Sequence, residues 1–423
     1  MIDHMAIWSA WLRTSAGLPA VQWSLLLALA AAAGHLVQRH MGLPKVVGYS
    51  VVGAIAGLAG FGGDVWPLNG ISLFVLELGV SLVLFEAGGR LALRWFRHNP
   101  MVLLQSLLEA VFTYALVYYT MRWLGMTGNV AEALAIIGVV SSPAVLSRVR
   151  LDTRATGPVT ERALALTTLG SLYALALVSA RTRVMHLPRE TLMDTLLPIG
   201  SVLGLSLLVG VVLALVLRLA LRIMSPTSEN TSMLLLTLIG ATAALAGHFG
   251  GSAALAALIG GLVLKQFNPR PFTWPRQLGT AGSLLIMLTF VLVSVVAARA
   301  SWNSAVAGVV LALLAARFAG KVLGVGTANW GSGLGWQQAF WTACAMQPLS
   351  AVALLLVAQY ATSSLTLGPQ IAAVALPAIL VMEALGAIVA TLALYATGES
   401  SRALSLQSAA EGPPSTPAGT QRG

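Results

Sequence analysis

Four glutamates lie within or at the ends of long apolar stretches, where an ionised side chain is costly unless it is paired or used. Counted at about 1.5 Å of helix rise per residue, Glu109 lies about 14 Å into its stretch, close to the middle of a ~30 Å hydrocarbon core. Glu383 lies about 20 Å into another stretch. Glu77 lies in the outer half of a third, and Glu86 lies near the inner end of that same stretch. A buried carboxylate can bind a cation and a proton in competition, so all four are candidate carriers.

Each glutamate also has a structural interpretation. Glu86 can pair with Arg90, which follows four residues later on the same helix face. Glu109 and Glu383 can instead hydrogen-bond a neighbouring helix. The position near a helix end favours the structural interpretation for Glu86, and both interpretations stay open for Glu109.

Two basic residues, Arg317 and Lys321, lie one turn apart on one face of the apolar segment 302–325. Arginine does not lose its proton in proteins, so we expect Arg317 to act only through its charge. Lysine can lose its proton when it is buried, so Lys321 can hand a proton over. The alternative for Lys321 is that its long side chain extends to the inner membrane interface.

Two prolines interrupt apolar segments in mid-span, and both have hydroxyl or amide neighbours. The first interruption is Ser141-Ser142-Pro143 in segment 129–147, and the second is Gln347-Pro348 with Ser350 in segment 336–360. A broken helix leaves backbone carbonyls and amides free to face a small substrate near the middle of the membrane. The alternative is a simple proline kink in each helix. The matching positions favour a substrate site.

The rest of the chain supplies the elements that must position these residues. Of 423 residues, 57% are hydrophobic and only 9% are charged, which is too little polar surface for a soluble fold. A helix that spans the membrane needs about 20 mostly apolar residues. We therefore predict an all-α integral membrane protein of about thirteen transmembrane helices, at 21–38, 46–62, 71–89, 100–122, 129–147, 159–180, 196–221, 231–247, 251–264, 278–298, 302–325, 336–360 and 370–397.

The loop charges predict the orientation. Most of the 24 Lys and Arg residues fall in alternate loops, which the positive-inside rule places in the cytoplasm. The chain would then lie in the cell (inner) membrane with its N-terminus outside and its C-terminus inside, which requires an odd number of helices. An odd number suits an inverted repeat with halves 21–180 and 231–397 around a linker helix, 196–221. In that frame the two interrupted segments correspond, and their breaks should cross.

The ends of the chain and its remaining motifs predict little chemistry. Residues 1–20 are predicted to be a lead-in, and residues 398–423, rich in Ser, Pro and Gly, a disordered cytoplasmic tail. The single cysteine, Cys344, excludes a disulfide, and His186 and His248 have no second ligand at metal spacing. Three loop glycines lack the context of a phosphate cradle, namely Gly331, Gly333 and Gly335. We expect no metal, cofactor, nucleic-acid partner or nucleotide-binding domain, and no enzyme activity.

Five motifs in chain order resemble those of one transporter family. They are Leu-Pro-Lys-Val-Val-Gly-Tyr at 43–49, the stretch 77–88, and residues 141–145, 251–264 and 347–348. Together they are similar to the monovalent cation:proton antiporters, in the Kef-like and NapA-like branch of the sodium/hydrogen exchanger superfamily, over roughly residues 25 to 395. The resemblance implies a homodimer with a dimerisation domain beside a mobile core domain, and alternating access. It also implies that Arg317 and Lys321 compensate the negative ends of the broken helices.

One departure from that family concerns the ion site. The family usually places an aspartate in the middle of its sixth helix, where this chain has Gly170 and Ser171. All four aspartates of the chain lie outside the predicted helices. Without that carboxylate, oxygens that could ligate a partly dehydrated cation are those of Ser141, Ser142, Gln347, Ser350 and Ser171. Thr167 is assigned to ordinary helix packing.

The sequence therefore predicts a secondary transporter in the lipid bilayer that exchanges Na⁺ or K⁺ for protons. The absent aspartate keeps a second interpretation open, namely a family member without proton coupling that carries another small solute, forms a uniport path or acts as a sensor. A sodium-coupled organic anion symporter with the same inverted architecture fits the motifs less well.

Overall fold

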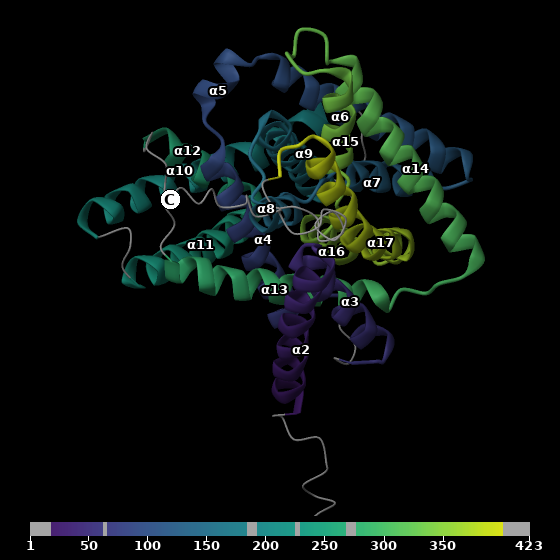
Figure 1. Ribbon diagram of the computed structural model, residues 1–423, viewed down its shortest axis with the longest axis horizontal. Helices are drawn as coiled ribbons and strands as arrows, with labels where there is room; N and C mark the ends of the chain where they lie inside the picture. The colour runs from purple at the N-terminus through teal and green to yellow at the C-terminus, as the bar shows by residue number, and fades with distance from the viewer. Residues whose placement is uncertain (1–17, 62–65, 184–192, 225–228, 268–275, 401–423) are drawn as a thin grey trace, which may run out of the picture.

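The described part of the chain is built from α-helices. The computed structural model describes residues 18–61, 66–183, 193–224, 229–267 and 276–400 (Figure 1). Within these ranges, nine helices are long and apolar enough to span a membrane when α7 and α8 are counted together, and four shorter apolar helices accompany them. The prediction of an all-α membrane protein is confirmed. The helices are α2 (Leu18–Met41), α3 (Lys45–Leu58), α4 (Gly70–Arg90), α5 (Leu93–His98), α6 (Met101–Trp123), α7 (Gly128–Val139), α8 (Pro143–Thr153), α9 (Pro158–Arg183), α10 (Met193–Ile223), α11 (Glu229–Phe249), α12 (Ala253–Phe267), α13 (Arg276–Ala298), α14 (Ser304–Thr327), α15 (Trp336–Ala345), α16 (Ala351–Ser363) and α17 (Leu367–Ala396).

Each predicted segment coincides with one helix or with two half-helices. Segment 129–147 is α7 followed by α8, and segment 336–360 is α15 followed by α16. Both prolines therefore mark full chain breaks, and the simple-kink alternative is wrong. A proline at the start of a half-helix loses no hydrogen bond there, because the first N–H groups of a helix have no partner within it.

Several boundaries differ from the prediction. α2 begins at Leu18, so the last residues of the predicted lead-in are helical, while residues 1–17 lie outside the described ranges. α8 extends to Thr153, past the predicted end at residue 147, and therefore includes Asp152. The short helix α5 is absent from the prediction. The added residues of α8 and the short helix α5 are rich in charged side chains, and hydropathy alone carries no signal for such a helix. The added residues of α2 are apolar and lie just before the predicted boundary.

The beginning of the predicted tail is bound to the helices. The carboxylate of Glu399 accepts hydrogen bonds from the backbone N–H groups of Val159 and Thr160, both at 2.7 Å, and from the Thr160 hydroxyl at 2.6 Å. The Ser400 hydroxyl donates to the carbonyl of Thr153 at 3.0 Å. A carboxylate at the start of α9 satisfies free N–H groups and suits the helix dipole. The packed region thus reaches Ser400, and the rest of the predicted tail lies outside the described residues.

The helices form two groups. The flanking group consists of α2, α3, α4 and α10 to α13, in which α12 packs along α4 and α10, and α3 packs along α2 and α13. The crossing group consists of α6 to α9 and α14 to α17, in which α6 packs along α14. In Figure 1, α10, α11 and α12 lie to the left, and α7, α14, α15 and α17 lie to the right.

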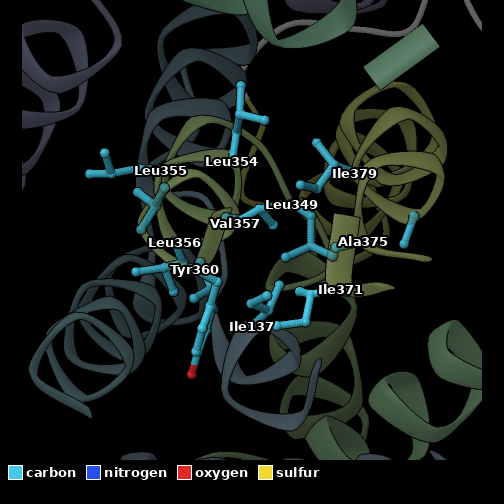
Figure 2. Packing of buried hydrophobic residues seen from close by; sticks show 14 of the residues in the cluster. Ile137, Leu349, Leu354, Leu355, Leu356, Val357, Tyr360, Ile371, Ala375 and Ile379 are labelled. Carbon is cyan, nitrogen blue, oxygen red and sulfur yellow. The ribbon is translucent and has the colours of Figure 1, made fainter. Parts of the chain in front are cut away.

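The second broken helix is enclosed by the crossing group. The consecutive residues 354–357 of α16 are all at most 1% exposed, so the helix is buried on every side. Figure 2 shows these side chains among Ile371 and Ile379 of α17, with Ile137 of α7 nearby. Irregular backbone at membrane depth is stable only where protein surrounds it. This apolar shell is what allows a chain break directly before α16.

Candidate functional site

The two chain breaks meet. Residues 140–142 separate α7 from α8, and residues 346–350 separate α15 from α16. The backbone N–H of Ser142 donates across the breaks to the carbonyl of Pro348 at 2.9 Å. The Ser142 hydroxyl also caps α8 by accepting an N–H from its first turn at 3.3 Å, with Pro143 in the first helical position. The predicted crossing of two broken helices is therefore present.

Arg317 of α14 joins both breaks. Its guanidinium donates to the carbonyls of Gly138 and Val140 at the end of α7, at 2.9 and 2.7 Å. It also donates to the carbonyls of Gln347 and Met346 after α15, at 2.7 and 3.3 Å, and to the Gln347 side-chain oxygen at 3.0 Å. The side chain is fully buried. Its positive charge lies at the negative ends of two half-helices and satisfies their free carbonyls.

Lys321, one turn further along α14, pairs with Glu109 of α6. Its Nζ lies 2.5 Å from Oε1 of Glu109 and 3.2 Å from the carbonyl of Val139, the last residue of α7. The Thr113 hydroxyl donates to the same carboxylate oxygen at 3.2 Å. Both members of the pair are fully buried. The alternative in which Lys321 extends to the membrane interface is wrong, because a carboxylate and a helix C-terminus attract the ammonium group inward.

Two glycines of α14 make this pairing possible. A Cβ atom at Gly324 would lie 2.3 Å from the Cα of Glu109, and one at Gly320 would lie 2.5 Å from the Cα of Thr113. Both positions therefore need glycine for the backbones of α6 and α14 to approach so closely. Lys321 follows Gly320 directly, which brings its side chain against Glu109.

Gly170 of α9 faces the same carboxylate. A Cβ atom at Gly170 would lie 3.9 Å from Oε2 of Glu109 and 3.4 Å from the carbonyl of Val139. The next residue, Ser171, donates from its hydroxyl to the carbonyl of Ser141 at 3.1 Å. A side chain at position 170 of α9 would point toward the carboxylate of Glu109. That carboxylate comes from α6 and lies close to the same place.

Two buried oxygens beside the crossing have no hydrogen-bond partner among the described residues. They are Oε2 of Glu109 and the hydroxyl oxygen of Ser141. Buried polar atoms are normally paired, so oxygens left over in this way are candidate ligands for a partly dehydrated cation. Gln347 is a weaker candidate, because its amide already donates to the carbonyl of Ala343 and accepts from Arg317. These two bonds hold the Gln347 side chain in place at the second break.

A cavity of about 240 Å³ lies between α4, α8 and α13, next to the first break. Its lining includes Ala144, which follows Pro143 directly, and the ion pair of Glu86 with Arg90. Arg90 also donates to the Ser147 hydroxyl at 3.4 Å. Glu86 therefore has the structural partner that the sequence favours. The pair forms a polar wall of this cavity.

The other predicted residues lie apart from the Glu109 pair. Glu77 of α4 is half-buried, and no hydrogen bond or ion pair joins it to the breaks within the described residues. Glu383 of α17 is fully buried and lies beside Ser350 of the second break. The Thr167 hydroxyl returns to a carbonyl of its own helix, which agrees with a packing role. Among the described side chains, no three of the His, Cys, Asp and Glu type gather at one place. His186 lies outside the described ranges.

The comparisons with known proteins agree with this architecture. The family described as "Sodium/hydrogen exchanger, transmembrane" matches residues 25–397. The chain belongs to this sodium/hydrogen exchanger family. Two solved structures of the sodium proton antiporter MjNhaP1 from Methanocaldococcus jannaschii, one at pH 8 and one an electron-microscopy map, each share 16% identity with the chain and a TM-score of 0.70. They cover 89% and 92% of this chain, and 98% and 100% of theirs. At that identity they show the shared fold. No curated protein matches the sequence.

The pairing of Glu109 with Lys321 is not predicted, although the sequence of this exchanger carries a signal for it. Glu109 and Lys321 are both predicted, but separately. Their pairing is indicated by Gly320 and Gly324, because two glycines four residues apart are typical of close helix contact. Ser294, which contacts Glu383, has no comparable signal, since a lone serine in an apolar helix usually serves local packing.

Proposed function

We propose that this exchanger moves Na⁺ against protons across the cell (inner) membrane, and that Na⁺ competes with the protonated Lys321 for the carboxylate of Glu109. One observation carries the proposal. A fully buried carboxylate beside two crossed chain breaks has one oxygen on an ammonium group and the other without a partner among the described residues. The family description and the names of the two solved structures support Na⁺ rather than K⁺.

The Glu109–Lys321 pair can keep the buried charge constant during exchange. Without a bound cation, the ammonium of Lys321 neutralises the carboxylate. A cation that binds the carboxylate adds a positive charge to a buried site, which is costly. Loss of one proton from Lys321 to water restores the balance. One proton therefore leaves as one cation enters, and the reverse steps on the other side of the membrane complete the cycle.

Arg317 has the complementary role. It keeps its proton at any physiological pH, so its charge stays with the ends of α7 and α15 throughout the cycle. Its contacts hold both breaks in place while the neighbouring pair changes its charge. Of the two basic residues of α14, Lys321 is therefore the one that can exchange a proton.

We also propose alternating access by movement of the crossing group against the flanking group. Two smaller apolar clusters lie wholly within the flanking group, one formed by α4 and α10 to α12 and one between α2, α3 and α13, so these would stay intact in such a movement. The cavity beside Glu86 lies on the boundary between the groups. The predicted thirteen-helix inverted repeat supports the same motion, because the two breaks come from corresponding segments of the halves.

Oligomeric state, membrane orientation and family branch are also inferred. We propose a homodimer formed through the flanking group, with the N-terminus outside and the C-terminus in the cytoplasm, as the loop charges favour. The contact of Glu399 with the start of α9 supports a common side for the C-terminus and the α8–α9 connection. Membership of the Kef-like and NapA-like branch rests on the motifs at 43–49 and 347–348.

Proteoliposomes that contain a pH-sensitive dye test the proposed exchange. Addition of Na⁺ outside acid-loaded vesicles should raise the internal pH, and K⁺ in a parallel sample should have a weaker effect. Glu109→Gln should abolish the response, whereas Glu86→Gln, a matched change in the wall of the cavity, should retain it. A pH response of Glu109→Gln equal to that of the unaltered protein would overturn the role of Glu109.

One observation favours a second function. Position 170 is a glycine and position 171 a serine, so the helix that usually carries the ion-binding aspartate has no carboxylate there. A carrier without proton coupling would transport its solute without any change in internal pH. In the same vesicles, uptake of radioactive Na⁺ with no dye response would support this second function and contradict exchange.

A further inference from the structure

A second buried carboxylate lies on the other side of the crossing. Glu383 of α17 is fully buried, and both its oxygens accept hydrogen bonds. The Ser294 hydroxyl donates to Oε2 at 2.6 Å, and the Ser350 hydroxyl donates to Oε1 at 3.1 Å. Neither serine belongs to the helix that carries the glutamate. The three side chains therefore form a polar cluster between helices, deep in an apolar surrounding.

The cluster joins the two helix groups. Glu383 and Ser350 belong to the crossing group, and Ser294 belongs to α13 of the flanking group. Ser350 holds the N-cap position of α16, but its hydroxyl makes no capping bond and turns to Glu383 instead. Gly386 lets α17 approach the second break closely, because a Cβ atom at this position would lie 2.6 Å from the Cα of Pro348. Separation of the two groups would therefore break the bond between Ser294 and Glu383.

No positive charge neutralises Glu383 within the described residues. None of the described hydrogen bonds or ion pairs links a basic side chain to its carboxylate. Of the basic residues of α14, Arg317 donates to carbonyls of both breaks and Lys321 pairs with Glu109, so neither contacts Glu383. The other titratable or charged side chains on helices packed against α17 make no described contact with Glu383; they are Lys45 and Tyr49 of α3, Glu132 of α7, Arg148, Arg150 and Asp152 of α8, Cys344 of α15 and Tyr360 of α16.

Serine hydroxyls suit a carboxyl group that changes its protonation state. A hydroxyl can donate to an ionised carboxylate, or accept from a protonated one after a rotation. The same three side chains can thus hold Glu383 in either state without a change of the backbone. An ionised carboxylate with no countercharge is costly at membrane depth, so the closed cluster holds the neutral acid.

We propose that Glu383, Ser294 and Ser350 form a second proton-binding site, separate from Glu109, which holds the two helix groups together when it is protonated and lets them part when it is ionised. The proton-binding part of this proposal does not depend on ion exchange at Glu109. The latching part rests on the proposed movement of the two groups. The site binds a proton, and the contact between α13 and α17 is what closes or opens with it.

Infrared spectroscopy of the purified protein in lipid tests the proton site without any transport. A protonated carboxyl group gives a carbonyl band that shifts on exchange into heavy water. All measurements use protein that carries Glu109→Gln, so that the carboxylate of Glu109 does not contribute to the band. At neutral pH the band should be present, should disappear with Glu383→Gln, and should change frequency with Ser294→Ala. Ser81→Ala removes an equally buried hydroxyl that has no described partner and should leave the band unchanged.

A band that stays unaltered with Glu383→Gln, or the absence of any such band at neutral pH, would overturn the proton site. Hydrogen–deuterium exchange then tests the latch. After correction for the intrinsic effect of pH, amides of α13 around Ser294 should exchange faster at alkaline pH than at neutral pH. In Glu383→Gln, which resembles the neutral acid at every pH, this increase should be lost. An equal increase in both proteins would contradict the latch while leaving the infrared result intact.

Discussion

At the scale of single residues, the two basic side chains of α14 make different kinds of contact. Arg317 has five hydrogen bonds to the ends of α7 and α15, and Lys321 has a carboxylate partner. A planar guanidinium can serve several carbonyls at once, whereas an ammonium group is a compact charge that can lose its proton. The chemistry of each residue type therefore matches the contacts that it makes.

Replacement of Arg317 by Gln should destabilise the protein strongly. The change leaves carbonyls of both half-helices without a donor and removes the buried positive charge, which should lower the free energy of unfolding by about 3 kcal/mol or more. Thermal unfolding in detergent measures this. The matched change Arg90→Gln removes a partly exposed ion pair and one long hydrogen bond to Ser147, and should cost at most about 1 kcal/mol. Equal melting temperatures for the two variants would contradict the assigned role.

Replacement of Lys321 by Arg should abolish exchange and keep the fold. The new side chain retains the positive charge beside Glu109 but cannot release a proton, so the exchange rate in proteoliposomes should fall by about 100-fold or more. Lys265→Arg makes the same change at the end of α12 and should exchange like the unaltered protein. Exchange by Lys321→Arg at the unaltered rate would remove Lys321 as the proton donor.

The sequence predicts most of the site residues but not their partners. Glu109, Arg317, Ser141 and Ser142 are singled out because charged groups and proline breaks are rare inside apolar segments. Which carboxylate meets Lys321 depends on the rotation of two helices about their axes, and apolar segments without a strong periodic face do not indicate it. The partner of Glu383, a serine on a distant helix, is unpredictable for the same reason.

At the scale of elements, the contact of α6 with α14 decides where the exchange pair forms. Glycine at positions 320 and 324 lets the two backbones approach closely, so the buried side chains of Glu109 and Lys321 meet between the helices. The apolar spans themselves follow from length and composition. The end of α8, residues 148–153, and the short helix α5 do not, because these short charged stretches carry no hydropathy signal.

Replacement of Gly324 by Ala should force α14 away from α6. The added methyl group would lie 2.3 Å from the Cα of Glu109, and the overpacking should cost about 1 to 3 kcal/mol and reduce exchange. Gly326→Ala is the matched control on the same helix, because nothing lies within 4 Å of its added Cβ. Thermal unfolding and vesicle exchange of both variants check this. A larger loss with Gly326→Ala than with Gly324→Ala would contradict the close contact.

At the scale of the whole molecule, the fold separates a group that holds the chain breaks from a group that surrounds it. The cluster of Glu383 and Ser294 and the cavity beside Glu86 both lie on the boundary of the two groups. Any movement that opens the crossing to one side must change these contacts. In the proposed mechanism, these contacts link ion binding at the crossing to the arrangement of the groups.

The proposed dimer predicts the mass of the particle in native lipid. Protein extracted in lipid nanodiscs should contain two copies of the 43.9 kDa chain, because α10 of the flanking group exposes apolar side chains, among them Leu208, Val212 and Leu219, to a second copy. Mass photometry or native mass spectrometry reads this directly. A single copy per particle at every protein-to-lipid ratio would contradict the dimer.

Proton release on Na⁺ binding is the sharpest test of whether Na⁺ and a proton compete at the buried pair of Glu109 and Lys321. Na⁺ is added to purified protein in weakly buffered detergent solution, and a pH indicator records the protons set free. The unaltered protein and Glu86→Gln should each release about one proton per bound cation, whereas Glu109→Gln should release none. Release of the same number of protons by Glu109→Gln would show that the competition takes place elsewhere and would contradict the account.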